Sequence, residues 1–99
     1  MLHIVNKSPF QTSSLDSCLR LAHPGSALLL IEDGVYAATT GSAAQERISA
    51  ACVHLKVYAL QPDMDARGVT AKLLDGVTPI DYAGFVDLAA EHHCSQSWL

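Results

Sequence analysis

The sequence predicts an α/β fold: a single three-layer domain with a mostly parallel sheet and helices on both faces. Residues 27–31 are five apolar residues without a helical period, stopped by Asp33 and Gly34. A parallel strand covered by helices on both faces is apolar throughout, whereas a surface strand alternates apolar and polar residues. Other strand-like segments alternate with helix-like ones, which favours right-handed crossovers within one sheet. The length of 99 residues fits one domain over residues 1–99.

Local signals assign the elements on either side of this strand. Residues 2–5 read as a first short strand. A capping box at residues 13–16 (SSLD) begins a helix over residues 14–22, which Pro24 and Gly25 end.

After the central strand the signals are more mixed. Residues 34–38 fit either a short turn of helix or a small extra strand, and both remain open. A second capping box at residues 42–45 (SAAQ) leads a helix to about residue 52. The apolar positions of that helix recur at spacings of three and four, as one buried face requires: Ala44, Ile48, Ala51 and Cys52.

The second half continues the alternation. Residues 56–60 form the third main strand. A short helix over residues 63–67 follows, with Pro62 at its first position and Gly68 at its end. Residues 77–80 form a short strand, and Pro79 within it indicates an edge or a strand end.

The last part of the chain is predicted to be one helix and one strand. Asp81 caps a helix over residues 82–92, whose inward side chains are Phe85, Leu88 and Ala89. Residues 94–98 are extended and pair as a final strand.

The composition favours a chain covered by another subunit. Charged residues are 16% of the sequence, against roughly a quarter in average soluble domains, and hydrophobic residues are 49%. So small a domain has too much surface to hide that apolar content alone. The alternative is a monomer unusually rich in small Ala and Val.

The charges and cysteines exclude several classes. The net charge is −4 and the six Lys and Arg are scattered, so direct nucleic-acid binding is not expected. No apolar run approaches the roughly 18 residues of a membrane span, and no signal peptide is apparent. Three cysteines without a CxxC motif argue against a disulfide framework and favour a reducing cytoplasm.

No cofactor or metal is expected. The motifs GxxxxGK[ST], GxGxxG, GxSxG and HExxH are absent. His92, His93 and Cys94 are adjacent in an extended segment, so their side chains alternate between faces and do not make a zinc site. Asp33 follows a strand, where it is either a site residue or a helix cap or turn former.

Cys18 is the candidate chemical residue. It shares a helix face with Leu15, Leu19 and Ala22, which favours a small hydrophobe in the core. Nothing local marks it as an activated thiolate. Cys52 is expected in the core, and Cys94 near the terminus is left open.

A series of blocks in order, over essentially the full length, resembles the DsrH/TusB family. The blocks are MLH at 1–3, NKSPF at 6–10, residues 15–19, LLIEDGV at 29–35, KVYAL at 56–60, Asp63, ARG at 66–68, IDY at 80–82, Phe85-Val86 and Trp98.

The resemblance implies the smallest subunit of a cytoplasmic sulfurtransferase complex. Its partners would be DsrE/TusD-like and DsrF/TusC-like subunits, assembled as a dimer of heterotrimers. Such complexes relay persulfide sulfur between donor and acceptor proteins, toward thiolation of a tRNA wobble uridine or in sulfur oxidation. The principal persulfide cysteine lies on the DsrE/TusD subunit.

Cys18 matches a cysteine of DsrH-type members that some TusB members lack. The sequence therefore predicts an accessory subunit first. It leaves open a subunit whose Cys18 carries persulfide sulfur, and, as a third possibility, a free-standing ligand-binding module.

Overall fold

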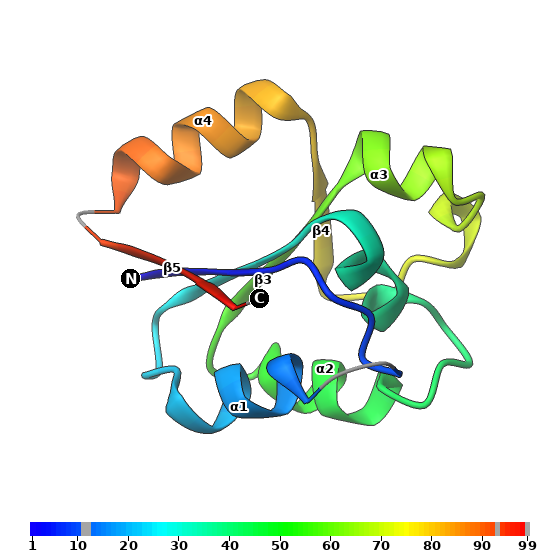
Figure 1. The fold of residues 1–99 in the computed structure, drawn as a ribbon, viewed down its shortest axis with the longest axis horizontal. Helices are drawn as coiled ribbons and strands as arrows, with labels where there is room; N and C mark the ends of the chain where they lie inside the picture. Colours follow the sequence, from blue (N-terminus) through cyan, green and yellow to red (C-terminus); the bar gives the residue numbers. More distant parts are fainter. Residues whose placement is uncertain (11–12, 93, 99) are drawn as a thin grey trace.

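A computed structural model describes residues 1–10, 13–92 and 94–98. Its centre is one five-stranded sheet with the order β4-β3-β2-β1-β5, in which all neighbouring strands are parallel (Figure 1). The expected parallel sheet is confirmed. The strands are β1 (Leu2–Val5), β2 (Ala27–Leu30), β3 (Lys56–Leu60), β4 (Val77–Ile80) and β5 (Ser95–Trp98).

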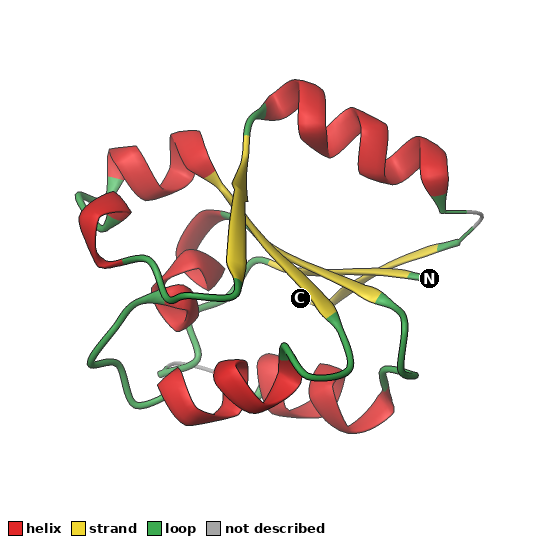
Figure 2. Ribbon diagram, turned by 180° about the vertical axis from the view of Figure 1, so that it is seen from behind, coloured by secondary structure: helices red, strands yellow, loops and turns green. Residues whose placement is uncertain are grey.

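The connections place helices on both faces of the sheet, as predicted. The helices α1 and α2 lie on one side and α4 on the other (Figures 1 and 2). The short α3 contacts β3 and the 3-10 helix η1 near the carboxyl ends of the strands. The helical elements are α1 (Ser14–Leu21), η1 (Glu32–Ala38), α2 (Gln45–Ala51), α3 (Gln61–Ala66), η2 (Thr70–Lys72) and α4 (Tyr82–Glu91).

Strand order explains the two layers of helices. The chain steps outward from β1 through β2 and β3 to β4, and then returns past β1 to form β5. Right-handed crossovers in opposite directions put their helices on opposite faces. The direction in which the chain moves across the sheet therefore changes at the boundary between β1 and β5.

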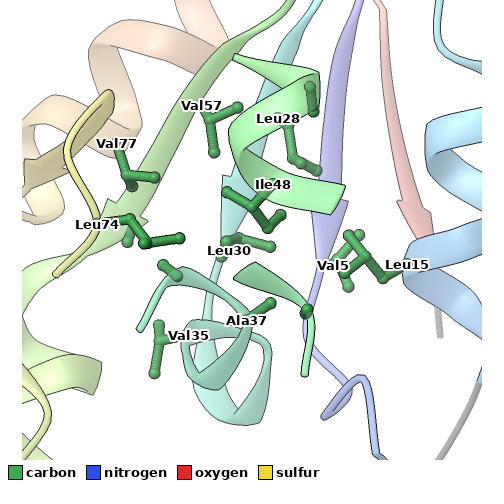
Figure 3. Packing of buried hydrophobic residues seen from close by; sticks show 14 of the residues in the cluster. Val5, Leu15, Leu28, Leu30, Val35, Ala37, Ile48, Val57, Leu74 and Val77 are labelled. Atoms are coloured by element: carbon green, nitrogen blue, oxygen red, sulfur yellow. The ribbon is translucent and has the colours of Figure 1, made fainter. Parts of the chain in front are cut away.

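The main core fills the space between the sheet and the α1–α2 layer. Strand β2 is buried along its whole length, which confirms its place as a central strand. Its residues Leu28 and Leu30 pack with Val5, Leu15 and Ile48 in this cluster (Figure 3). A smaller cluster on the opposite face joins Leu2, Ala27, Leu29 and Leu88.

Several predicted boundaries differ by a few residues. Ser13 precedes α1 but makes no side-chain capping bond. Helix α2 begins only at Gln45, after an extra turn in which Ser42 Oγ accepts from the backbone nitrogen of Ala44 at 3.2 Å. The Gln45 side chain reaches back to accept from the backbone nitrogen of Gly41. Both polar residues therefore bond backbone N–H groups, but not as the predicted cap.

Other end signals act as predicted. Asp81 Oδ1 accepts from the Gly84 backbone nitrogen at 2.8 Å and caps α4. Gly68 follows α3 with a φ of 67°, the left-handed conformation that glycine favours after a helix. Pro79 lies in β4, which is an edge strand. The start of α3 differs from the prediction: the helix is Gln61–Ala66, so Pro62 is its second residue and not its first.

Residues 34–38, for which the sequence allowed either a turn of helix or an extra strand, are helical. The 3-10 helix η1 starts at Glu32, whose φ of 49° turns the chain sharply after β2. One inward assignment was wrong: Ala89 is exposed, because α4 meets the sheet mainly through Leu88 and the half-buried Phe85. Among the described residues, no helix is long and apolar enough to cross a membrane.

Candidate functional site

Cys18 lies in the middle of α1 with its side chain turned into the main core. It is 0% exposed and belongs to the same buried cluster as Leu15 and Val5. The amphipathic pattern of α1 explains this position, because Leu15, Cys18 and Leu19 lie on the helix face that packs against the main core. The structure therefore places the side chain of Cys18 between α1 and the sheet and not at the surface.

Burial also sets the chemistry of this thiol. Loss of solvation raises the pKa of Cys18 to about 11, since the thiolate is disfavoured away from water. Thiolates are the nucleophiles in sulfur exchange, and reactive cysteines lie in accessible surroundings that lower their pKa. Cys18 has neither property in this conformation.

The other two cysteines lie near the amino ends of the strands. Cys52 follows α2, is half-buried, and donates its S–H to the carbonyl oxygen of Gly76 at 3.6 Å. Burial raises its pKa as well. Cys94 is exposed just before β5. Cys52 is thus only partly the core residue that was expected, since it packs at the margin of the main cluster.

Asp33 lies at the carboxyl-end edge of the sheet, where open α/β folds usually hold their ligands. It caps no helix there. Its Oδ1 accepts from Nε of Arg67 at 2.9 Å, which ties η1 to the end of α3. Asp63 adds to the same connection, because its Oδ2 accepts from the backbone nitrogen of Glu32 at 2.6 Å.

At this carboxyl-end edge, close packing of η1 against β1 adds to the ion pair between Asp33 and Arg67. Gly34 lies so near β1 that a Cβ atom there would be 2.3 Å from the carbonyl oxygen of Val5. None of the three cysteines of the chain lies at this edge. The edge therefore holds a structural ion pair and no thiol.

No metal centre is found in the described part of the chain, where His, Cys, Asp and Glu form no group of three or more suited to a metal. His92 follows the end of α4, and Cys94 is exposed before β5. His93, the third member of the predicted cluster, lies outside the described residues.

One feature that sequence reasoning missed is a pocket of about 240 Å³ beside α1 and β5. Trp98 forms part of its wall and donates a hydrogen bond from Nε1 to Nδ1 of His3 at 3.1 Å. Burial lowers the pKa of His3, and the positive N-terminus and His23 lower it further. The pocket is lined by Met1, His3, Leu21, His23, Gln96 and Trp98.

A family model described as "DsrH like protein" matches residues 7–95 of the chain. The chain belongs to the DsrH family. Its curated relatives include Protein TusB of Shigella flexneri and Protein TusB of Pectobacterium parmentieri. Each is 42% identical over 98 residues, covering 99% of this chain and 100% of the relative.

Solved structures extend the comparison of the fold. The ychN protein of E. coli superposes on this DsrH-family chain with a TM-score of 0.78 at 23% identity, covering 97% of both chains. The protein MTH1491 of Methanobacterium thermoautotrophicum gives 0.75 at 18% identity, covering 97% of this chain and 95% of the other. At these identities the likeness concerns the fold alone.

The DsrH-family chain also exposes apolar side chains on α4. Tyr82 is 61% exposed and Val86 is 66% exposed, and only Leu88 of this helix is buried. An amphipathic surface helix normally turns polar residues outward. The outer face of α4 departs from this pattern at Tyr82 and Val86.

Proposed function

We propose that this chain is an accessory subunit of a cytoplasmic sulfur relay complex. In the proposed assembly it packs with a DsrE/TusD-like and a DsrF/TusC-like subunit, as a dimer of heterotrimers. The DsrE/TusD-like subunit carries the persulfide, and this chain completes the assembly without reacting itself. Membership of the DsrH family supports the assignment to a relay.

The observation that carries the accessory role is the burial of Cys18. Relay of sulfur between cysteines requires a thiolate to attack the outer sulfur of a persulfide, which forms a new S–S bond and releases the donor's thiolate. Cys18 is fully buried, and its pKa is raised to about 11. We therefore assign it to packing. A persulfide-carrying Cys18 stays a prediction that needs α1 to move.

Two surface properties support a role inside an assembly. The outer face of α4 is apolar around Tyr82 and Val86. The low content of charged residues, 16%, is typical of a chain that other subunits cover. The net charge of −4 agrees with a subunit that leaves RNA to other proteins of the relay.

The pathway that receives the sulfur is one of two. The relay ends either in thiolation of a tRNA wobble uridine or in oxidation of stored sulfur. Genes for dissimilatory sulfite reductase next to the gene of this chain would favour oxidation.

The test is reconstitution. The chain is co-expressed with DsrE- and DsrF-like subunits of the same organism, and the three are expected to co-purify in gel filtration. The assembly is then incubated with a persulfide donor, and each cysteine peptide is measured by mass spectrometry. We expect one added sulfur on the DsrE-like subunit and none on Cys18.

The variant Cys18→Ala separates the two possible roles of Cys18. In a folded assembly, Cys18→Ala is expected to leave the rate of sulfur transfer unchanged. An added sulfur on the Cys18 peptide, together with slower transfer in Cys18→Ala, would instead make Cys18 a relay residue. A chain that co-purifies with neither partner and stays a monomer at high concentration would overturn the proposal of a complex.

A further inference from the structure

The two edges of the sheet differ in their free hydrogen-bonding groups. At the outer edge of β4, the Val77 N–H donates a hydrogen bond to the carbonyl oxygen of Leu74 at 3.3 Å. Pro79, two residues on, has no N–H. This edge therefore offers no donor at either position, which is one way in which proteins prevent further strand pairing.

The edge at β5 has no such protection. The Cys94 carbonyl accepts from the Leu2 backbone nitrogen at 3.0 Å, so it faces β1. Because backbone groups alternate in direction along a strand, Ser95 and Ser97 point theirs away from β1. Both serines are exposed, and β5 pairs only with β1 among the described residues. The strand Ser95–Trp98 contains no charge, proline or bulge that would block a further strand.

A pocket lies directly beside this open edge. Gln96 and Trp98 of β5 line it together with Leu21, which is 65% exposed at the end of α1. Its volume of about 240 Å³ is below the roughly 300–1,000 Å³ of small-molecule sites. It is of a size for one large side chain. Among the described residues, His3, His23 and the N-terminal Met1 are its only lining residues with a basic group, and no carboxylate lines it.

We propose that β5 is a docking edge for an extended segment of a different protein, which adds a sixth strand and inserts one apolar side chain into this pocket. In this recognition mode, main-chain hydrogen bonds supply affinity and side-chain pockets supply selectivity. The strand, which contains no charged residue, matches an uncharged segment, and the apolar side chains of Leu21 and Trp98 in the pocket wall match an apolar side chain. The inference is independent of the sulfur relay assignment.

A second copy of the chain fits this edge poorly. Pairing of β5 with β5 would bring only Ser95, Gln96, Ser97 and Trp98 to the partner. Trp98, the one large apolar residue among them, is already held by His3 and packs against the main core. A copy therefore has no free apolar side chain in this strand to fill the pocket.

The edge itself is tested with Ser97→Pro, and Ser97→Ala is the matched control. Proline removes only the outward N–H, and the preceding Gln96 already has the extended conformation that proline requires. A library of random displayed heptapeptides is selected on the full-length wild-type chain. We expect enrichment of peptides with one apolar residue among β-branched ones. Their affinity should fall about tenfold in Ser97→Pro and stay unchanged in Ser97→Ala.

The pocket has its own variant, Leu21→Glu, which puts a charge at the rim without touching the core. It should weaken the same peptides about tenfold, since their apolar side chain would meet a carboxylate. If Ser97→Pro lowers the melting temperature or changes the circular dichroism spectrum, peptides N-methylated at alternate positions replace it. One alternation should abolish binding and the other should keep it.

Three results would overturn the proposal. One is no peptide enrichment above that obtained on Ser97→Pro. Another is enriched peptides that bind Ser97→Pro or their N-methylated forms equally well. The third is concentration-dependent self-association in gel filtration that Ser97→Pro abolishes, because the occupant would then be a second copy.

Discussion

The indole nitrogen of Trp98 donates a hydrogen bond to Nδ1 of His3 across 3.1 Å, joining residues 95 positions apart in the chain. The bond fastens the edge strand β5 to β1, with the two ring centroids 6.1 Å apart. It requires the neutral imidazole, because Nδ1 accepts only when it carries no proton. The end of the chain is therefore held by a bond that acid can break.

This bond predicts a loss of stability at acidic pH. Burial lowers the pKa of His3 in the folded state, so the unfolded chain takes up a proton first as pH falls through about 6.5. The free energy of unfolding should decrease from pH 7 to pH 5. In His3→Asn, whose Oδ1 also accepts from Trp98 without titrating, the decrease should be smaller. Urea unfolding at each pH measures it, and equal slopes for both proteins would contradict the prediction.

The packing of Cys18 predicts different costs for two similar substitutions. Cys18→Ser puts a hydroxyl into a fully buried apolar site and should lower the free energy of unfolding by about 1–3 kcal/mol. Cys18→Ala removes the sulfur without adding a polar group and should cost less. Urea unfolding of both variants checks the order. A serine variant as stable as wild type would mean that water reaches this position.

The three thiols should react in the order of their exposure. Under native conditions at pH 8, iodoacetamide should alkylate the exposed Cys94 first and the half-buried Cys52 more slowly. Cys18 should react only when the chain unfolds, because it is buried and its pKa is about 11. Peptide mass spectrometry over time follows each site. Rapid native alkylation of Cys18 would reveal an open state of α1.

The close approach of η1 to β1 makes Gly34 sensitive to any side chain. In Gly34→Ala the new Cβ would collide with the Val5 carbonyl, and the backbone must shift at a cost of about 1–3 kcal/mol or more. Gly41→Ala is the control: its φ is 81° but the space around it is open, so only conformational strain is added. Thermal unfolding compares the two. A Gly34→Ala variant no less stable than Gly41→Ala would contradict this packing.

The sequence by itself determined the elements and their alternation. The apolar run in β2, the Asp81 cap and Gly68 after α3 are local signals, and local physics gives them the same meaning in any fold. The parallel sheet with helices on both faces follows from that alternation. The helix boundaries were less certain. Ser13 before α1 makes no capping bond, and Ser42 before α2 bonds the backbone nitrogen of Ala44 instead of capping the helix.

Tertiary structure alone decided which residues meet. The pairing of Asp33 with Arg67, the bond between Trp98 and His3, and the pocket beside β5 join segments far apart in the chain. Sequence patterns carry no signal for such pairs, since each depends on strand order. The same holds for Cys18: its helix face favoured the core, but only the packing of α1 on the sheet excludes the thiol from water and raises its pKa.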